Sequence, residues 1–217
     1  MSSWEQREAF LIAAAQRCLE GHKTFALTRA QLVHASQISR GTVYNHFPTE
    51  ADLPVAIATD CYRQWNMAAQ RDSEEFTVPL ACFLYHHSRR LKTMLQQRCF
   101  VIGRIMPNQT LLTQATAVHA AAFRHQYDAY EQWNRTLIQQ IGELEGYDRT
   151  ELVSGFIRGT LINTDDAGRD FADLALYRQF CYALLQLLGQ SEQRVPDDAK
   201  LQQVLFAEMT QLVNTAG

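Results

Sequence analysis

The chain has 217 residues, of which 47% are hydrophobic and 20% are charged, with a formal net charge of −3 at pH 7. This composition is ordinary for a globular protein and excludes a disordered or fibrous chain. No apolar run approaches the roughly 18 residues that span a bilayer, and the N-terminus lacks the basic and apolar regions of a secretory signal. We therefore expect a cytoplasmic protein that does not associate with membranes.

Charge is distributed unevenly along the chain. Residues 1–49 hold five basic and three acidic residues, a net charge of +2, which leaves −5 for the remainder. Residues 21–49 contain no acidic residue. A modest basic region of this kind is compatible with nucleic-acid binding. Because one copy would bind DNA weakly, the charge distribution favours a dimer.

The first predicted helix covers residues 4–20, where apolar side chains recur at helical spacing. Thr28 followed by Gln31 is the pattern of a capping box and predicts a second helix starting at Thr28. Polar residues at 36 and 37 then interrupt the apolar pattern and predict a turn. We expect the first helix to support the two that follow.

A short third helix is predicted over residues 40–46, capped by Ser39 and ended by Pro48. Val43 is its only aliphatic side chain, and the rest are polar, aromatic or glycine, so the helix is too polar for a core. A polar helix that follows a short bracing helix is typical of a helix-turn-helix, which presents donors to base edges and phosphates.

This region resembles the signature of the tetracycline-repressor (TetR) family, which usually runs V-S-x-G-T-L-Y-x-H-F-P-x-K-x-x-L. The matching residues are Ile38, Ser39, Gly41, Thr42, Tyr44, His46, Phe47, Pro48 and Leu53. The resemblance covers the N-terminal quarter of the chain. It implies that Thr28, Tyr44 and His46 contact phosphates and that Arg40, Thr42 and Asn45 face the bases. The full set of predicted DNA contacts is Thr28, Arg29, Ser39, Arg40, Gly41, Thr42, Tyr44, Asn45 and His46.

Three positions depart from the family pattern. Gln37 replaces the turn glycine, so a residue other than glycine is expected to adopt an unusual backbone conformation there. Glu50 stands where the family often has a phosphate-binding lysine, and a carboxylate suits a helix N-terminus but not DNA. Lys23 replaces a glycine before the motif, which predicts a different loop shape.

The remaining chain reads as helices without strands, internal repeats or a low-complexity linker. Further helices are expected over residues 50–69, 79–99, 100–106, 109–144, 149–162, 171–188 and 197–212. The sequence therefore predicts an all-α fold of about ten helices. We expect a three-helix DNA-binding head over residues 1–48 and a larger helical body for regulation and dimerisation over residues 49–217.

A stripe of aromatic and aliphatic residues on the 109–144 helix allows two interpretations. Core packing is one, and a pocket for a small effector, which the family resemblance implies, is the other. The candidate pocket residues are Trp65, Phe83, His87, Phe100, His119, Phe123 and Tyr127. The histidines of the body do not have metal-site spacing on one helix, so neither a metal site nor a cofactor is expected.

Gly155 and Gly159 lie one turn apart and predict close packing of another backbone, because glycine otherwise costs about 1 kcal/mol in a helix. The resemblance implies that the penultimate helices pair across a two-fold axis. The predicted dimer interface comprises Phe156, Gly155, Gly159, Leu174, Cys181 and Leu185. The five widely spaced cysteines form no disulfide or zinc pattern; buried free thiols are expected, with a redox-sensing thiol as the alternative.

These features together predict a sequence-specific transcriptional regulator that binds double-stranded DNA. The expected form is a homodimeric repressor that a small-molecule effector releases from a palindromic operator. The alternative is a DNA-bound adaptor that recruits a protein partner. An enzyme is not expected, because the chain has no G-x-S-x-G, phosphate-binding glycine loop or H-E-x-x-H.

Overall fold

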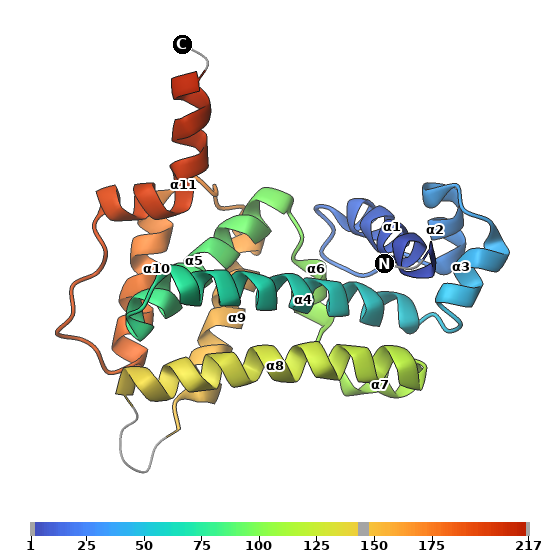
Figure 1. Cartoon of the computed structure of the whole chain (residues 1–217), viewed down its shortest axis with the longest axis horizontal. Helices are drawn as coiled ribbons and strands as arrows, with labels where there is room; N and C mark the ends of the chain where they lie inside the picture. The colour runs from blue at the N-terminus through green and yellow to red at the C-terminus, as the bar shows by residue number, and fades with distance from the viewer. Residues whose placement is uncertain (1–2, 143–147, 216–217) are drawn as a thin grey trace. The chain divides into compact units, whose positions relative to one another are not determined.

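The computed structural model describes residues 3–142 and 148–215, with side chains up to residue 207, and within these ranges all regular structure is helical. Figure 1 shows the helices in chain order. Their bounds are α1 Ser3–Leu19, α2 Arg29–Ser36, α3 Arg40–His46, α4 Asp52–Glu75, α5 Pro79–Gln97, α6 Val101–Ile105, α7 Gln109–Gln114, α8 Ala117–Gly142, α9 Thr150–Asp166, α10 Leu174–Leu187 and α11 Asp198–Thr215. The prediction of an all-α fold is confirmed.

The helices form two compact units. The first contains the residues up to Met67 and Gln97–Glu131, and the second contains Ala68–Gln96 and the residues from Gln132 on. Helices α4 and α8 each begin in the first unit and end in the second. The functional boundary that we predict after residue 48 lies inside the first unit and stays a prediction.

The first unit has an apolar core to which α1, α2, α3 and the start of α4 all contribute. Helix α2 packs against both α1 and α3 (Figure 1). Leu11, Leu32, Val43, Phe47 and Leu53 have no exposed surface. The single aliphatic residue of α3, Val43, therefore fixes one side of this polar helix to the core.

The predicted helix over residues 109–144 is two helices, α7 and α8, separated at Ala115 and Thr116. The backbone amide and hydroxyl of Thr116 donate to Asp52 Oδ1 at 2.7 and 2.9 Å. Ala115 has extended backbone, with φ −74° and ψ 157°. A contact with a residue 64 positions away in the sequence thus accompanies the break. Leu144, the predicted end of the long helix, lies outside the described residues.

The predicted end of the 50–69 helix is also wrong, because α4 continues to Glu75. Asp72 is 4% exposed and is paired with His86 and Arg89, so its side chain faces the helical body, whereas residues 73–75 are exposed. Helix α9 similarly continues to Asp166, past the predicted end at residue 162. Helix α10 begins at Leu174 with an Asp173 cap, three residues later than predicted.

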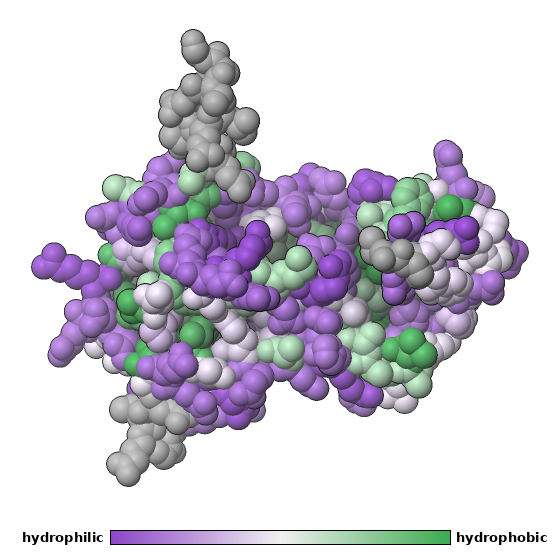
Figure 2. All heavy atoms as spheres, in the orientation of Figure 1, coloured by the Kyte–Doolittle hydropathy of each residue, from purple (hydrophilic) through white to green (hydrophobic). Residues whose placement is uncertain are grey.

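No helix in the described part of the chain is long and apolar enough to cross a membrane. On the face seen in Figure 2, hydrophobic residues form separate green areas among hydrophilic ones. The large apolar side chains that remain exposed include Leu152 on α9 and Tyr182 on α10, at 45% and 57%.

Candidate nucleic-acid interface

The candidate site is built from α2, the following turn and α3, each fixed by local caps. Thr28 Oγ1 accepts the Gln31 amide at 3.2 Å, and Gln31 Oε1 accepts the Thr28 amide at 2.8 Å, so the predicted capping box is present. Ser39 Oγ accepts the Thr42 amide at 3.2 Å and starts α3 at the predicted residue. Gln37 lies between the helices with φ 56° and ψ 21°, the left-handed conformation expected for the residue that replaces glycine.

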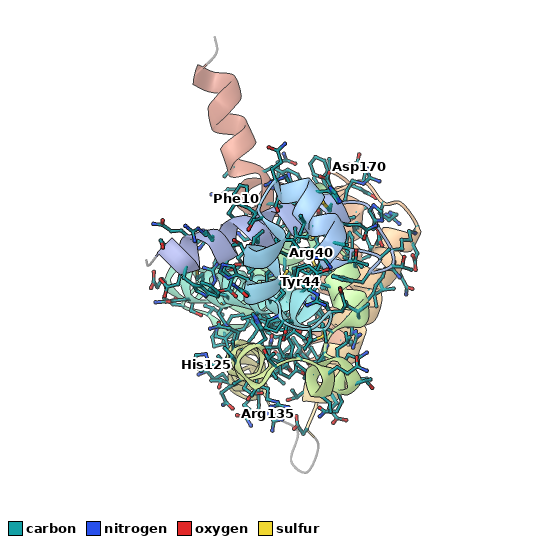
Figure 3. All side chains as sticks on the ribbon, turned by 90° about the vertical axis from the view of Figure 1, so that its right-hand side faces the viewer. Phe10, Arg40, Tyr44, His125, Arg135 and Asp170 are labelled. Carbon is teal, nitrogen blue, oxygen red and sulfur yellow. The ribbon has the colours of Figure 1, made fainter. Side chains whose placement is uncertain are left out.

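The outer side of α3 carries polar side chains in water. Arg40, Gly41 and Asn45 are exposed, and Thr42 and Tyr44 are half-buried. Arg40 and Tyr44 are labelled in Figure 3, and the Arg40 guanidinium carbon lies 5.0 Å from the Tyr44 ring centroid. Guanidinium and amide groups of this kind are the ones that pair with guanine and adenine edges in a major groove.

Arg29 was predicted as a DNA contact, but its guanidinium is engaged within the protein. It donates to Glu50 Oε1 at 2.9 Å and to the carbonyl of Phe47 at 2.9 Å. Its side chain is only 15% exposed. Glu50 departs from the family pattern, and in the structure it forms an ion pair with Arg29.

His46 was predicted to contact a phosphate, but its ring is 3% exposed. The Trp4 ring stacks on it with centroids 3.6 Å apart, and both ring nitrogens are buried without a hydrogen-bond partner. Burial lowers the pKa of His46, and the charges of Arg7 and His119 lower it further, which favours the neutral ring. In this conformation the His46 side chain is not available to a phosphate, so we remove it from the candidate contacts.

Trp4 and His119 both contact His46 at the end of α3. The helix-turn-helix motif did not predict either contact. His119 Nε2 donates to the backbone carbonyl of His46 at 2.8 Å, and its ring lies 5.8 Å from that of Phe47. His119 was predicted to line an effector pocket. The structure instead places it against the end of α3, because α8 begins beside this end of the first unit.

Three of the other candidate pocket residues meet in an aromatic cluster of the first unit. The Tyr62 ring lies 4.6 Å from Trp65, 5.6 Å from Phe123 and 5.3 Å from Tyr127, in edge-to-face geometry. Phe123 is 1% exposed. Edge-to-face packing at these distances stabilises a core, which favours the core-packing interpretation of the α8 stripe. Phe100 is also buried in this unit, at 3% exposure.

Phe83 and His87 lie in the second unit, in a buried polar cluster between α4, α5 and α8. His87 Nε2 bonds Asn134 Oδ1 at 2.9 Å, and the Phe83 ring lies 4.4 Å from the His87 ring. The neighbouring His86 bonds Asp72 Oδ2 at 2.7 Å. The sequence gave no sign of this network, because Asp72 lay in a predicted loop.

The candidate dimer residues divide into an open set and a buried set. A Cβ added to Gly155 or Gly159 would meet nothing within 4 Å, so this side of α9 is open in the single chain. Phe156 and Leu174 are partly exposed. Cys181 and Leu185 are 0% and 1% exposed and pack inside the chain itself, so the proposed interface leaves them out.

Cys82 and Cys181 are buried, and Cys18, Cys61 and Cys99 are half-buried. All five are free. Burial raises the pKa of Cys181 to about 11, while a contact with Ser88 lowers it only partly. Burial also raises the pKa of Cys82 and Cys99, so these three thiols stay protonated and weakly nucleophilic. Within residues 3–142 and 148–215 no three His, Cys, Asp or Glu side chains form a group that could hold a metal ion.

No protein-family model and no curated protein matches the sequence. Solved structures do match. RolR in complex with resorcinol is 16% identical with a TM-score of 0.56, over 89% of this chain and 97% of that one. A TetR transcriptional regulator from Rhodococcus sp. RHA1 is 17% identical with a TM-score of 0.55, over 85% and 97%. The chain thus has the fold of TetR-family regulators, a helical head followed by a helical body.

Proposed function

We propose, from the TetR-family fold of this chain, that it is a sequence-specific DNA-binding transcriptional regulator. The observation that carries the proposal is the capped α3 helix, held to the core by Val43 while Arg40 and Asn45 remain in water. Such a helix fits a major groove, with α2 bracing it against the backbone. The proposed contacts are Thr28, Ser39, Gly41 and Tyr44 near phosphates, and Arg40, Thr42 and Asn45 near bases.

Alanine substitutions at α3 test this assignment. Tyr44→Ala is expected to weaken binding at all DNA sequences, because phosphate contacts carry no sequence information. Arg40→Ala or Asn45→Ala is expected to cost roughly 1 to 3 kcal/mol at the preferred site and to relax the preference at one base pair. Selection of bound DNA from a random pool, followed by titration at fixed salt concentration, measures both effects. Unchanged affinity in all three variants would overturn the assignment.

We propose that the regulator acts as a homodimer on a palindromic operator. The open side of α9 supports this, because Gly155 and Gly159 leave space for a second backbone and Leu152 is 45% exposed beside them. The modest positive charge of residues 1–49 also calls for two heads on one DNA molecule. The proposed interface is α9 and α10 with Gly155, Phe156, Gly159 and Leu174.

Gly159→Arg is expected to convert the dimer to a monomer and to weaken operator binding. The arginine fills the open space on α9, while the helix itself gains about 1 kcal/mol because arginine is a better helix former than glycine. Sedimentation equilibrium measures the oligomeric state. Gln139→Arg, at an exposed position of α8, adds the same charge elsewhere and is expected to leave the dimer intact. A dimeric Gly159→Arg variant would argue against this interface.

We further propose that a small aromatic effector releases the dimer from the operator. RolR, whose fold this chain resembles, was solved with resorcinol, a small aromatic molecule. An effector shifts binding only if its affinity differs between DNA-bound and released forms. Helices α4 and α8 run through both units and are the natural carriers of such a change.

The adaptor function and the effector are tested by separate measurements. Operator titrations with resorcinol and related phenols are expected to show weaker DNA binding in at least one case. If none changes the affinity, the effector proposal fails while the DNA-binding proposal stands. A palindrome close to promoters is expected for a regulator, whereas many dispersed sites would favour the DNA-bound adaptor.

A further inference from the structure

Arg29 and Glu50 form an ion pair that spans the helix-turn-helix. Arg29 is the first residue of α2, and Glu50 lies between α3 and α4. The Arg29 Nε donates to Glu50 Oε1 at 2.9 Å, and the Arg29 backbone amide donates to Glu50 Oε2 at 3.2 Å. One carboxylate therefore fixes both the side chain and the backbone of Arg29. It also lies at the N-terminus of α2, where the helix dipole favours a negative charge.

The other side of the Arg29 guanidinium reaches the end of α3. Nη1 donates to the carbonyls of Phe47, at 2.9 Å, and Pro48. These carbonyls directly follow α3, so Arg29 links the start of α2 to the end of the DNA-reading helix. A planar guanidinium can make these bonds in several directions at once, which a lysine ammonium on a flexible stem does less well.

The Arg29 guanidinium also lies over the ring of Tyr44, one of the proposed phosphate contacts. Its central carbon lies 4.3 Å from the centroid of the Tyr44 ring. A cation at this distance from an aromatic ring attracts it, and the ring loses freedom to turn. The Arg29 side chain is 15% exposed, whereas that of Glu50 is 57% exposed. The carboxylate therefore faces water while the arginine is held beneath it against Tyr44.

We propose that Arg29 is a positioning residue of the DNA-reading head and not a phosphate contact. Glu50 holds its guanidinium against the Tyr44 ring, so that Tyr44 meets the DNA backbone in one orientation. This inference rests on the proposed DNA-binding function. It gives Glu50 a favourable role at a position where a negative charge would otherwise only repel DNA.

Salt dependence separates positioning from phosphate contact. A side chain that neutralises a phosphate contributes about 0.9 to the slope of log affinity against log salt concentration. A positioning residue leaves this slope unchanged and lowers the affinity at every salt concentration. The measurement uses the full-length chain and its selected operator, with Arg29→Lys, Arg29→Ala and Glu50→Gln compared with wild type.

We expect Arg29→Lys and Arg29→Ala to lower operator affinity by a similar factor, on the order of tenfold, which corresponds to about 1.4 kcal/mol. The slope of log affinity against log salt concentration stays at its wild-type value in both variants. Glu50→Gln removes a negative charge near DNA and nevertheless weakens binding, because the hold on Arg29 is reduced. The loss in the Arg29→Ala, Glu50→Gln double variant is smaller than the two single losses combined. Arg63→Ala, an exposed arginine on α4, serves as the control and keeps wild-type affinity.

The opposite results identify what has failed. Near-wild-type binding by Arg29→Lys, with a slope smaller by about 1 in Arg29→Ala, overturns the positioning role and leaves DNA binding intact. Tighter binding by Glu50→Gln also overturns it. A wild-type chain that selects no DNA overturns the proposed function and this inference together. Thermal unfolding of each variant identifies loss of folding; if Arg29→Ala unfolds, Glu50→Gln decides the question, because the Phe47 and Pro48 bonds remain available to Arg29.

Discussion

Asp52→Ala is expected to lower the free energy of unfolding by about 2 to 4 kcal/mol, since several hydrogen bonds to an ionised acceptor are lost at once. Asp52 has no exposed surface. Its Oδ2 accepts the Thr49 amide at 2.7 Å, and its Oδ1 accepts the amide and hydroxyl of Thr116 at 2.7 and 2.9 Å. Alanine removes these acceptors and leaves the amides of half-buried Thr49 and Thr116 without these partners. A urea titration at neutral pH measures the loss of stability.

The ionised form of Asp52 is the form that stabilises the fold. Burial opposes ionisation, but the hydrogen bonds from Thr49 and Thr116 outweigh it and hold the pKa of Asp52 below 3.8, the ordinary value for aspartate. Its contribution is therefore present above pH 3.8 and is lost as the pH falls through the lower, folded-state pKa.

Controls separate this network from general effects of losing an aspartate. Asp128→Ala, at an exposed position of α8, is expected to change stability by less than about 0.5 kcal/mol. Thr116→Val removes only the hydroxyl bond and should cost less than Asp52→Ala. The Asp52→Ala, Thr116→Val double variant should lose less stability than the sum of the two single losses, because both residues belong to one hydrogen-bond network. Equal stabilities of Asp52→Ala and Asp128→Ala would contradict the proposed role.

Features encoded by neighbouring residues were predictable from the sequence. The capping box at Thr28, the cap at Ser39 and the end of α3 before Pro48 all depend on residues within four positions of one another. The outline of the DNA-reading helix therefore follows from local chemistry. The unusual backbone conformation of Gln37, in contrast, was expected from the family resemblance, because the family has glycine at this turn.

Features that depend on distant residues were not predictable in the same way. The break between α7 and α8 coincides with the bond from Thr116 to Asp52, and the burial of His46 depends on Trp4, near the start of the chain. The apolar spacing of α10 marked Cys181 as a packing residue but could not show whether it packs inside or between chains. A periodic pattern defines a buried side of a helix without naming what covers it.

The polar interior of the second unit was missed because its members looked like solvent-facing residues. Asp72 lies in a charged stretch of sequence, yet it accepts from His86 at 2.7 Å and pairs with Arg89, which also bonds Glu75. Charged residues are buried when partners compensate them. The partners of Asp72, His86 and Arg89, are on α5. The pattern of a single sequence does not show which helix packs against α4.

His87→Gln is expected to reduce the loss of stability that the wild-type protein shows as the pH falls below 6.5. Burial, with the nearby charges of His86 and Arg90, holds the pKa of His87 well below 6.5, against a smaller raising effect of the bond to Asn134. The unfolded chain therefore takes up a proton near pH 6.5, and the folded chain does so only at lower pH. Stability rises with pH across that interval, by about 1.4 kcal/mol for each unit by which the pKa is lowered.

Urea titrations between about pH 5 and pH 8, the range in which histidine changes charge, measure this dependence. Glutamine keeps a donor for Asn134 but does not titrate, so the variant should have the smaller slope. His46 and His86 also have lowered pKa values and act in the same direction, so part of the slope should remain. His125→Gln, at an exposed position of α8, controls for the loss of a histidine. Equal losses of stability by His87→Gln and wild type on acidification would contradict this prediction. In that case His87 would gain its proton in the folded state as readily as in the unfolded chain, and its burial would not contribute to the acid sensitivity of the second unit.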